Sequence, residues 1–458
     1  MRHTAWSGLW ALGVGMFMAA CGGEKPRPTA PPTNMTDKDA GEISGSEPYD
    51  GSVPLPRKDA GPIMIPPGDP EEGLIGECAV DSNKIYTVAQ RSEPFRSTPL
   101  AVDSVNSRFI IPFANTGDCL DAVHMATLAG DATGGKPTDT APIKPCALVR
   151  DAAATALSDR WLIASIDNRQ GAYDLWLTPY EAESGAVADA QRLTMSSAVE
   201  TSVALATLQS RDAALLAYAD EDAAAGQTLS VRPLDNLGKP TADAVKLDES
   251  KDLFFSNVVL KPLGKGAAIA YVRTSFDFKT SDIVFVMLDA QGKSLREPWV
   301  LTRLAGPSPS VDLAVDDESG GIVYARAEAS TGRQIWFQLI DTDGQAALLR
   351  DGKSRSPAQR IVNSPQRGID VSIAKLRATF VVGYRSLPLT ADARAALRAY
   401  FLDRNGLIVG SSDVSYTSSG GGRTNVQSSS DGRVVLAWNE LNATGSALKM
   451  VRMPCVGN

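Results

Sequence analysis

The chain has 458 residues, of which 43% are hydrophobic, and its 45 Lys and Arg against 53 Asp and Glu give a formal net charge of −8. A chain of this length can bury a large core but exceeds one ordinary compact domain, which favours a repetitive architecture. The acidic balance, with no basic cluster in the sequence, argues against nucleic acid as a partner.

The N-terminal residues 1–20 have the order of a targeting segment. Arg2 precedes an apolar stretch of about 16 residues, which is short for a spanning helix that needs about 20. The stretch ends in Met18-Ala19-Ala20-Cys21, which resembles the lipobox of bacterial lipoprotein signals, with Met18 in place of the usual Leu. The resemblance implies lipidation of Cys21, and Gly22 after it favours the outer membrane. The alternative is an ordinary cleaved signal with an incidental cysteine.

Residues 21–74 are predicted to be a lipidated cysteine followed by a disordered tether. From residue 24 to about residue 73 the chain is rich in Pro, Gly, Asp, Glu, Ser and Thr and poor in aromatic residues. Such a segment cannot bury enough apolar surface to fold. A flexible chain of about 50 residues has an r.m.s. span of roughly 40 Å, so the tether can hold a folded domain clear of lipid headgroups.

The folded part, residues 75–458, is predicted to be built from seven copies of one unit. Each copy contains a short apolar strand with a period of 52 to 60 residues, and six of the seven strands end in an aromatic residue. The strands are FIIPF (109–113), WLIAS (161–165), LLAY (215–218), AIAY (268–271), GIVY (321–324), FVVGY (380–384) and VVLAW (434–438).

Each copy continues with a third strand, a glycine turn and a fourth strand. Third strands include IVFVML (283–288) and IWFQLI (335–340), and the turns that follow include LDAQG (288–292) and IDTDG (340–344). Asp can bond to its own backbone and Gly can take a positive φ, so the turns predict tight hairpins. Four antiparallel strands per unit, without helical periodicity, are typical of a β-propeller blade. A row of β-sandwich domains is the alternative, but its period would be about twice as long.

Both ends of the chain are predicted to close the ring. The last copy has room for only three strands, and residues 85–94 before the first copy look like the fourth-strand segments 189–194 and 357–362. Closure by this N-terminal strand would remove exposed sheet edges. Cys78, Cys119, Cys146 and Cys455 are an even number in an exported protein and allow three disulfide pairings. The predicted closure favours Cys78 with Cys455, and Cys119 with Cys146.

The signal, the tether and the repeated units together are similar to the propeller lipoproteins of bacterial cell envelopes, including those of myxobacteria. That resemblance is architectural and covers the whole chain. It implies an all-β, seven-bladed propeller held at the membrane by an N-terminal lipid, and it does not transfer a function.

Few residues of the chain suggest catalysis. His3 leaves with the signal, so His124 is the one histidine of the mature chain, and no G-x-S-x-G motif is present. His124 alternates with apolar residues in an expected strand and is predicted to be structural. Neither a metal site nor a cofactor is predicted. The carboxylate clusters at residues 220–222 and 316–318 are predicted to lie in solvated turns.

The candidate binding face consists of polar residues at equivalent positions of the copies. In blade geometry, these positions meet at one face and around the mouth of the central channel. We call the last residue of each repeated apolar strand its anchor. The residues two positions beyond the anchors are Asn115, Asp167, Asp220, Arg273, Arg326, Ser386 and Glu440. The residues at the entry of the inner strands are Ser202, Asn257, Ser310, Asp370 and Asn425. The alternative is that these residues cap strands through side-chain to backbone hydrogen bonds.

The sequence therefore predicts a monomeric, outer-membrane-tethered propeller that acts by binding an envelope protein or a glycan, without being an enzyme. The insertion at residues 386–397 is predicted to be the main contact element, with helical character. The alternative function is a glycan hydrolase or lyase that uses two carboxylates on the loop face. An enzyme should show a deep polar pocket in which two carboxyl groups converge within about 5 to 9.5 Å, whereas a binding scaffold should show a flat face decorated by loops.

Overall fold

The computed structural model describes residues 75–78, 85–91, 95–97, 100–103, 108–115, 123–128, 138–143, 147–181, 187–195, 198–222, 226–305, 310–316, 319–328, 332–341, 344–347, 357–362, 367–387, 395–417, 424–428, 433–442 and 445–457. All of them lie in one compact unit, Pro67–Asn458. The predicted signal peptide, Cys21 and the tether lie outside the described residues, as do Cys119 and Cys146.

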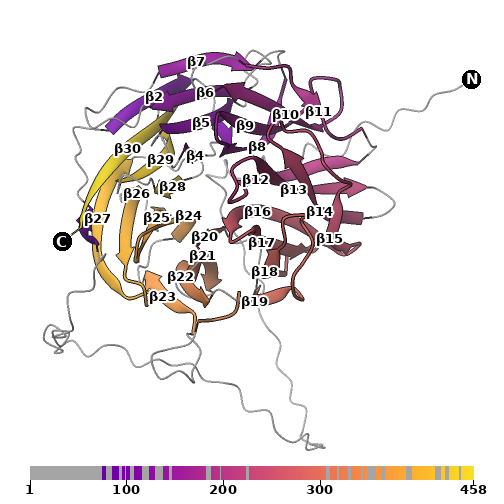
Figure 1. Cartoon of the computed structure of the whole chain (residues 1–458). Helices are drawn as coiled ribbons and strands as arrows, with labels where there is room; N and C mark the ends of the chain where they lie inside the picture. Colours follow the sequence, from indigo (N-terminus) through magenta and orange to yellow (C-terminus); the bar gives the residue numbers. More distant parts are fainter. Residues whose placement is uncertain are drawn as a thin grey trace, which may run out of the picture. The chain divides into compact units, whose positions relative to one another are not determined.

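The described elements are all β-strands, arranged in a ring of antiparallel sheets (Figure 1). No helix in these residues is long and apolar enough to cross a membrane.

Five sheets have four strands each, in chain order from the centre of the ring outwards. The first contains β8 (Val149–Ala156), β9 (Arg160–Asp167), β10 (Asp174–Glu181) and β11 (Gln191–Arg192). The second contains β12 (Val199–Thr207), β13 (Ala213–Asp222), β14 (Gly226–Asp235) and β15 (Val245–Ser250). The third contains β16 (Leu253–Leu263), β17 (Gly266–Ser275), β18 (Thr280–Leu288) and β19 (Trp299–Ala305).

The fourth contains β20 (Val311–Val315), β21 (Ser319–Glu328), β22 (Gly332–Asp341) and β23 (Gln359–Val362). The fifth contains β24 (Arg367–Leu376), β25 (Thr379–Leu387), β26 (Ala395–Leu402) and β27 (Ile408–Thr417). These sheets confirm the prediction of a β-propeller with four-stranded antiparallel blades.

Two further sheets involve the N-terminal strands. In one, β3 (Phe95–Ser97) and β4 (Ala101–Asp103) both pair with β5 (Arg108–Asn115), which continues to β6 (Val123–Leu128) and β7 (Thr138–Ile143). In the other, β28 (Thr424–Ser428) and β29 (Arg433–Asn442) continue to β30 (Gly445–Gly457), which pairs with both β1 (Ile75–Cys78) and β2 (Ile85–Arg91). His124 lies in β6, the strand in which it was expected.

The hydrophobic core lies between neighbouring sheets. One cluster, for example, joins buried residues of β12, β13 and β14 to buried residues of β16, β17 and β18. The aromatic residues of the repeated apolar runs lie within the second strands and are part of this core, because Tyr271, Tyr384 and Trp438 are at most 1% exposed. The spacing of 53 residues between Tyr218, Tyr271 and Tyr324 therefore reflects a buried aromatic residue at the same position of three blades.

The glycine turns have the predicted conformation. The Asp235 carboxylate accepts hydrogen bonds from the backbone N–H groups of Leu237 and Lys239, both at 2.8 Å, and Gly238 has φ +77°. A Cβ on Gly238 would lie 2.2 Å from the side chain of Leu177, on the third strand of the preceding blade. Glycine is thus required both by the backbone conformation and by the close approach of the neighbouring blade. The turns that begin at Asp289, Asp341 and Asp403 repeat the pattern.

The insertion at residues 386–397 differs from its prediction. Residues 386–387 continue β25 and residues 395–397 begin β26, so these five positions are strand and not helix. Residues 388–394 lie outside the described residues. At these two ends the strands continue the hairpin pairing, in which Ser386 lies opposite Ala396.

Candidate functional site

The candidate site is one end of the central channel, which the innermost strands surround (Figure 1). A cavity of about 140 Å³ lies at the level of Ser310, Asp370 and Asn425, and we call it the channel mouth. A second cavity of about 430 Å³ lies further along the same strands, towards residues 207–211 and 262–264. Both cavities are lined by Leu205, Lys261 and Gln427, which are therefore wall residues of one channel.

Four predicted binding residues come together at the channel mouth. Asn257, Ser310, Asp370 and Asn425 all line this cavity, although they come from four different blades. Ser202 does not line it, because it is 4% exposed and its hydroxyl points to Asp151 at 3.4 Å. The 53-residue spacing thus located a real convergence of polar groups.

Most of the described polar groups at the mouth connect one inner strand to the next. Asp312 on β20 accepts hydrogen bonds from the Ser372 hydroxyl at 2.5 Å and from the Ile373 N–H at 2.9 Å, both on β24. Its other oxygen accepts the N–H of Leu313 at 2.8 Å. The Ser372 hydroxyl in turn accepts the N–H of Val426 on β28 at 2.9 Å. These bonds replace the sheet pairing that neighbouring inner strands lack.

The same connection recurs at other seams between blades. Asp151 on β8 accepts the N–H of Val203 on β12 at 3.2 Å. Asp370 on β24 accepts the hydroxyl of Ser310 at 3.3 Å and the backbone N–H of Thr424 on β28. Ser310 and Asp370 therefore follow the alternative of side-chain to backbone hydrogen bonds, whereas the Ser202 hydroxyl bonds to the Asp151 side chain.

The residues beyond the strand anchors form internal networks. Asp167 is fully buried and makes a two-pronged ion pair with Arg169, with N–O distances of 2.8 and 2.6 Å. Arg273 donates to Asp248 of the preceding blade at 2.7 Å, and the Tyr271 hydroxyl donates to the same carboxylate oxygen at 2.7 Å. Burial of Tyr271 and the charge of Asp248 raise the pKa of its phenol.

The remaining members of that group are similarly engaged. Arg326 lies over the Trp336 ring, 5.2 Å from its centroid, and Glu440 pairs with Lys449 at 2.9 Å. Asp220 is partly buried in β13, and burial raises the pKa of its carboxyl, with a smaller contribution from Asp222. Residues 220–222 thus belong to a strand and not to a solvated turn. Asn115 and Ser386 are strand residues whose side chains lie outside the described part.

The carboxylates at the channel mouth are hydrogen-bonded to neighbouring groups. Asp312 and Asp370 are the two carboxylates that line it, and all four of their oxygens accept hydrogen bonds. A glycosidase needs one carboxyl that can donate a proton and one that can attack or activate water. Within the described ranges, no three His, Cys, Asp or Glu side chains are placed to hold a metal ion.

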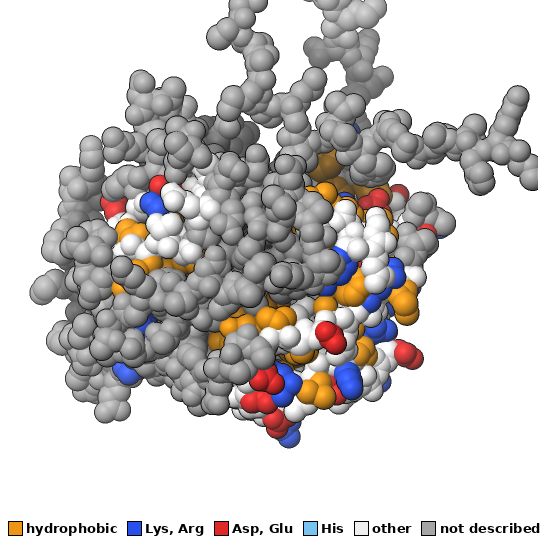
Figure 2. All heavy atoms as spheres, turned by 90° about the horizontal axis from the view of Figure 1, so that it is seen from above, with side chains coloured by type: hydrophobic (Ala, Val, Ile, Leu, Met, Phe, Trp, Pro, Cys, Tyr) orange, Lys and Arg blue, Asp and Glu red, His pale blue; other side chains and the backbone are white. Residues whose placement is uncertain are grey.

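Sequence reasoning missed an exposed aromatic cluster at the β17–β18 turn. Phe276 and Phe278 are 48% and 54% exposed, and they are the aromatic residues among the large hydrophobic side chains that the described surface exposes. On the face that Figure 2 shows, the described acidic and basic side chains are interspersed. The turn lacks Gly, Pro and Asn, so nothing in the sequence marked the tip as distinct from the strands.

The sequence matches no protein family and no curated protein. Among solved structures, a puromycin hydrolase mutant is similar at 12% identity and a TM-score of 0.48, over 81% of this chain and 53% of that one. The chain therefore spans about half the length of that enzyme. A subtype N11 neuraminidase-like protein of A/flat-faced bat/Peru/033/2010 is similar at 10% identity and a TM-score of 0.41, over 84% of this chain and 96% of that one.

Proposed function

We propose that the protein is a lipid-anchored propeller of the outer membrane that binds an envelope protein or a glycan and does not turn it over. The observation that carries this proposal is the state of the channel-mouth carboxylates. Asp312 and Asp370 serve as acceptors between blades, with Ser372, Ile373 and Thr424 as donors. Hydrogen bonds of this kind join neighbouring blades and support a structural role for both carboxylates.

We also propose that the ring has seven blades and closes through β2. The antiparallel pairing of β2 with β30, from Ile85 opposite Val451 to Arg91 opposite Ser446, supports this closure. β1 places Cys78 directly opposite Cys455 in its register with β30, and Cys455 is disulfide-bonded. We therefore propose Cys78 as the partner of Cys455. Non-reducing peptide mapping tests this pairing, and a peptide that links Cys455 to Cys119 or Cys146 would contradict it.

Anchoring at Cys21 is tested separately from binding. The expected N-terminal peptide of the mature chain begins at Cys21 and carries the mass of attached acyl chains, and globomycin should cause the precursor to accumulate. A mature chain that begins after another residue, or an unmodified Cys21, would contradict the proposed anchor and leave the binding function untouched.

Binding without turnover is tested with the full chain. The immobilised protein is incubated with solubilised envelope proteins and, in parallel, with defined envelope glycans. Saturable retention of a protein or glycan that is recovered intact supports the proposal. Glycan cleavage that is lost in Asp370→Asn or Asp312→Asn, with the unfolding midpoint retained, would favour the hydrolase or lyase instead.

A further inference from the structure

The β17–β18 turn carries a compact aromatic cluster, which we call the aromatic tip and define as Phe254, Phe276 and Phe278. The ring of Phe254, in the inner strand β16, lies 5.1 Å from that of Phe278 and 6.0 Å from that of Phe276. Phe254 is partly buried, whereas the other two are about half exposed. The tip therefore presents two aromatic side chains to solvent on a third that supports them.

The backbone at the tip is in a conformation that normally favours glycine. Phe278 has φ 57°, in the left-handed region that side chains with a Cβ rarely occupy. The comparable turn between β16 and β17 has Gly264 at φ 54°. Arg211, Asn257 and Arg377 share this conformation, but Phe278 is the aromatic residue among these described positions, and it is exposed. An exposed aromatic side chain at a strained position is a candidate for function.

Hydrogen bonds hold the turn in one conformation. The Phe278 N–H donates to the Ser275 carbonyl at 2.8 Å, and the Ser275 hydroxyl donates to Asp277 at 2.7 Å. The Lys279 N–H also donates to Asp277, at 3.1 Å. Hydrogen bonds from Ser275 and Lys279 lower the pKa of Asp277 to about 2, so the carboxylate stays ionised. The two exposed rings are thus presented by a pre-organised turn, which limits the entropy lost on binding.

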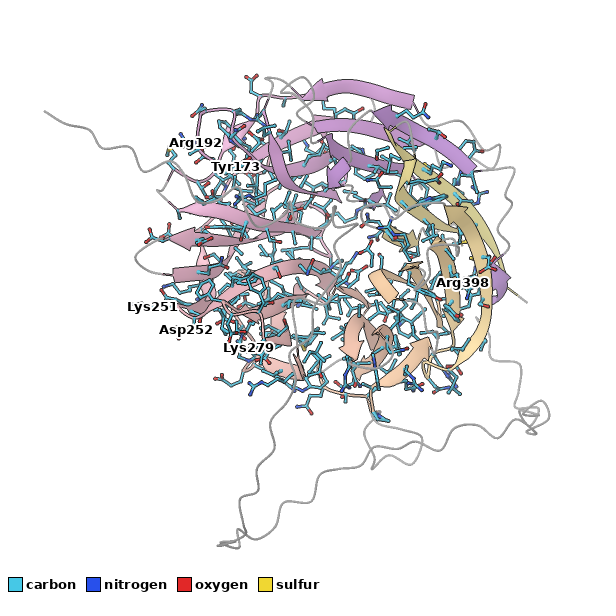
Figure 3. The ribbon with its side chains drawn as sticks, turned by 180° about the vertical axis from the view of Figure 1, so that it is seen from behind. Tyr173, Arg192, Lys251, Asp252, Lys279 and Arg398 are labelled. Carbon is cyan, nitrogen blue, oxygen red and sulfur yellow. The ribbon has the colours of Figure 1, made fainter. Side chains whose placement is uncertain are left out.

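Two Lys and two Asp residues lie in the two connections that form the aromatic tip, and we call these four residues its rim. Lys251 and Asp252 lie in the connection between β15 and β16, and Asp277 and Lys279 lie in the turn itself. Figure 3 shows Lys251, Asp252 and Lys279 gathered at one edge of the ring. All four side chains are exposed, and Lys279 pairs with Asp277 at 3.0 Å.

The charge of this rim distinguishes between an anionic bilayer and a protein as the binding partner of the aromatic tip. An anionic bilayer is attracted by an excess of Lys and Arg, but the rim has a net charge of zero and the chain a net charge of −8. An apolar centre surrounded by a polar rim of mixed sign is instead the anatomy of a protein–protein contact, and buried aromatic residues dominate the affinity of such contacts.

We infer that the aromatic tip is the contact by which this propeller docks a partner protein, and that the partner presents an apolar pocket with a rim of mixed charge. The inference rests on the proposed binding function and names the residues and the kind of partner. Phe276 and Phe278 fill the pocket, Phe254 supports them from below, and the four charged residues set the orientation of the partner.

The test uses photo-crosslinking followed by affinity measurement with the full chain. Benzoylphenylalanine replaces Phe276 in one variant and Leu295 in the control. Leu295 is 56% exposed and lies beyond the opposite end of β18, so it matches the exposure of the tip without sharing its position. The crosslinked protein is identified and purified, and its dissociation constant is measured for the unaltered chain, Phe276→Ser and Leu295→Ser.

The expected result is a crosslink from position 276, but not from position 295, to a protein other than this chain. The dissociation constant should rise at least tenfold in Phe276→Ser and change less than twofold in Leu295→Ser, while the two variants keep the same unfolding midpoint. A crosslink to lipid or to a second copy of this chain would overturn the inference, as would equal affinity of all three chains. A partner that binds Phe276→Ser normally contradicts the aromatic tip as the contact but leaves the binding function standing. Cleavage of a glycan contradicts the binding function itself.

Discussion

At the seam between β20 and β24, Asp312 is 8% exposed and accepts three hydrogen bonds, whereas at the β17–β18 turn Phe278 is 54% exposed and sits at φ 57°. A charged residue is buried at the seam, and an apolar residue is exposed at the turn. Both depart from the usual distribution of residues, in opposite directions. Hydrogen-bond donors from the neighbouring blade offset the desolvation of the Asp312 carboxylate. No contact of the described fold offsets the exposure of the apolar Phe278 ring to water in the same way.

In a repeated fold, a feature that recurs from blade to blade and a feature of a single blade have different causes. Ser310 and Asp370, which occupy equivalent positions at the channel mouth, have a structural task, because they help to join one blade to the next without sheet hydrogen bonds. The aromatic tip occurs at one turn of one blade, so it does not serve the repeat. A feature that breaks the repeat is therefore a better candidate for recognition than one that follows it.

The largest effect is expected from the seam. Asp312→Ala removes the acceptor for the Ser372 hydroxyl and the Ile373 N–H and leaves these buried donors unpaired, which should lower the free energy of unfolding by about 3 kcal/mol. Denaturation by urea measures the change. The control is Asp159→Ala, whose carboxylate is 58% exposed in its pair with Arg160 and should cost less than about 1 kcal/mol. Equal losses would contradict the structural role of the seam.

A somewhat smaller effect is expected where one blade's glycine turn meets the next blade. Gly292 has φ +80°, and a Cβ there would lie 2.7 Å from the Val231 side chain. Gly292→Ala should therefore cost about 2 to 4 kcal/mol, from backbone strain and overpacking together. Gly171 has φ +97° with no atom within 4 Å of an added Cβ, so Gly171→Ala should cost only the strain, about 1 kcal/mol. If both cost the same, the contact between blades contributes nothing.

A pH-dependent effect is expected at the buried carboxyl of Glu200. Glu200 is 1% exposed, and burial raises the pKa of its carboxyl, partly offset by a hydrogen bond from Thr194. A carboxyl whose pKa is higher in the folded state stabilises the fold below its unfolded pKa and loses that contribution as the pH rises through the folded value. Glu200→Gln should therefore gain stability relative to the unaltered chain between acidic pH and pH 8. A difference that is constant over this range would show that Glu200 is not desolvated.

The smallest change in stability is expected at the aromatic tip. Phe278→Gly relieves left-handed strain of about 1 to 2 kcal/mol and loses a ring contact of about 0.5 to 1.5 kcal/mol, so the free energy of unfolding should change by less than about 1 kcal/mol. Phe278→Ala keeps the strain and loses the ring, so it should be less stable than Phe278→Gly by about 1 kcal/mol. Thermal unfolding of both variants measures this order. The reverse order would show that the left-handed backbone at position 278 holds no strain that glycine relieves.

The blade was predictable from the sequence because its signals are local or periodic. An apolar run that ends in Tyr271 or Tyr324 recurs every 53 residues, and an Asp three residues before a Gly fixes a tight turn. Both signals come from requirements within one blade or between adjacent blades, and the structure meets them at Asp235 and Gly238.

The hydrogen-bond partners of the polar residues at the channel mouth were less predictable from the sequence. The period placed Ser310 and Asp370 at equivalent positions around the channel, but it could not show that they bond to each other at 3.3 Å. Such a bond depends on the distance between two inner strands that are 60 residues apart in the sequence. The exposure of Phe276 and Phe278 was missed for a different reason, since alternating Phe residues in the run SFDFK resemble the buried face of a strand.

The most direct test is the affinity of the crosslinked partner protein for two variants, measured by isothermal titration calorimetry with the full chain. We expect Phe276→Ser to weaken binding at least tenfold, and Asp370→Asn, at the channel mouth, to leave the dissociation constant within about twofold. If Asp370→Asn abolishes binding and Phe276→Ser does not, recognition takes place at the channel mouth and the aromatic tip is not the contact.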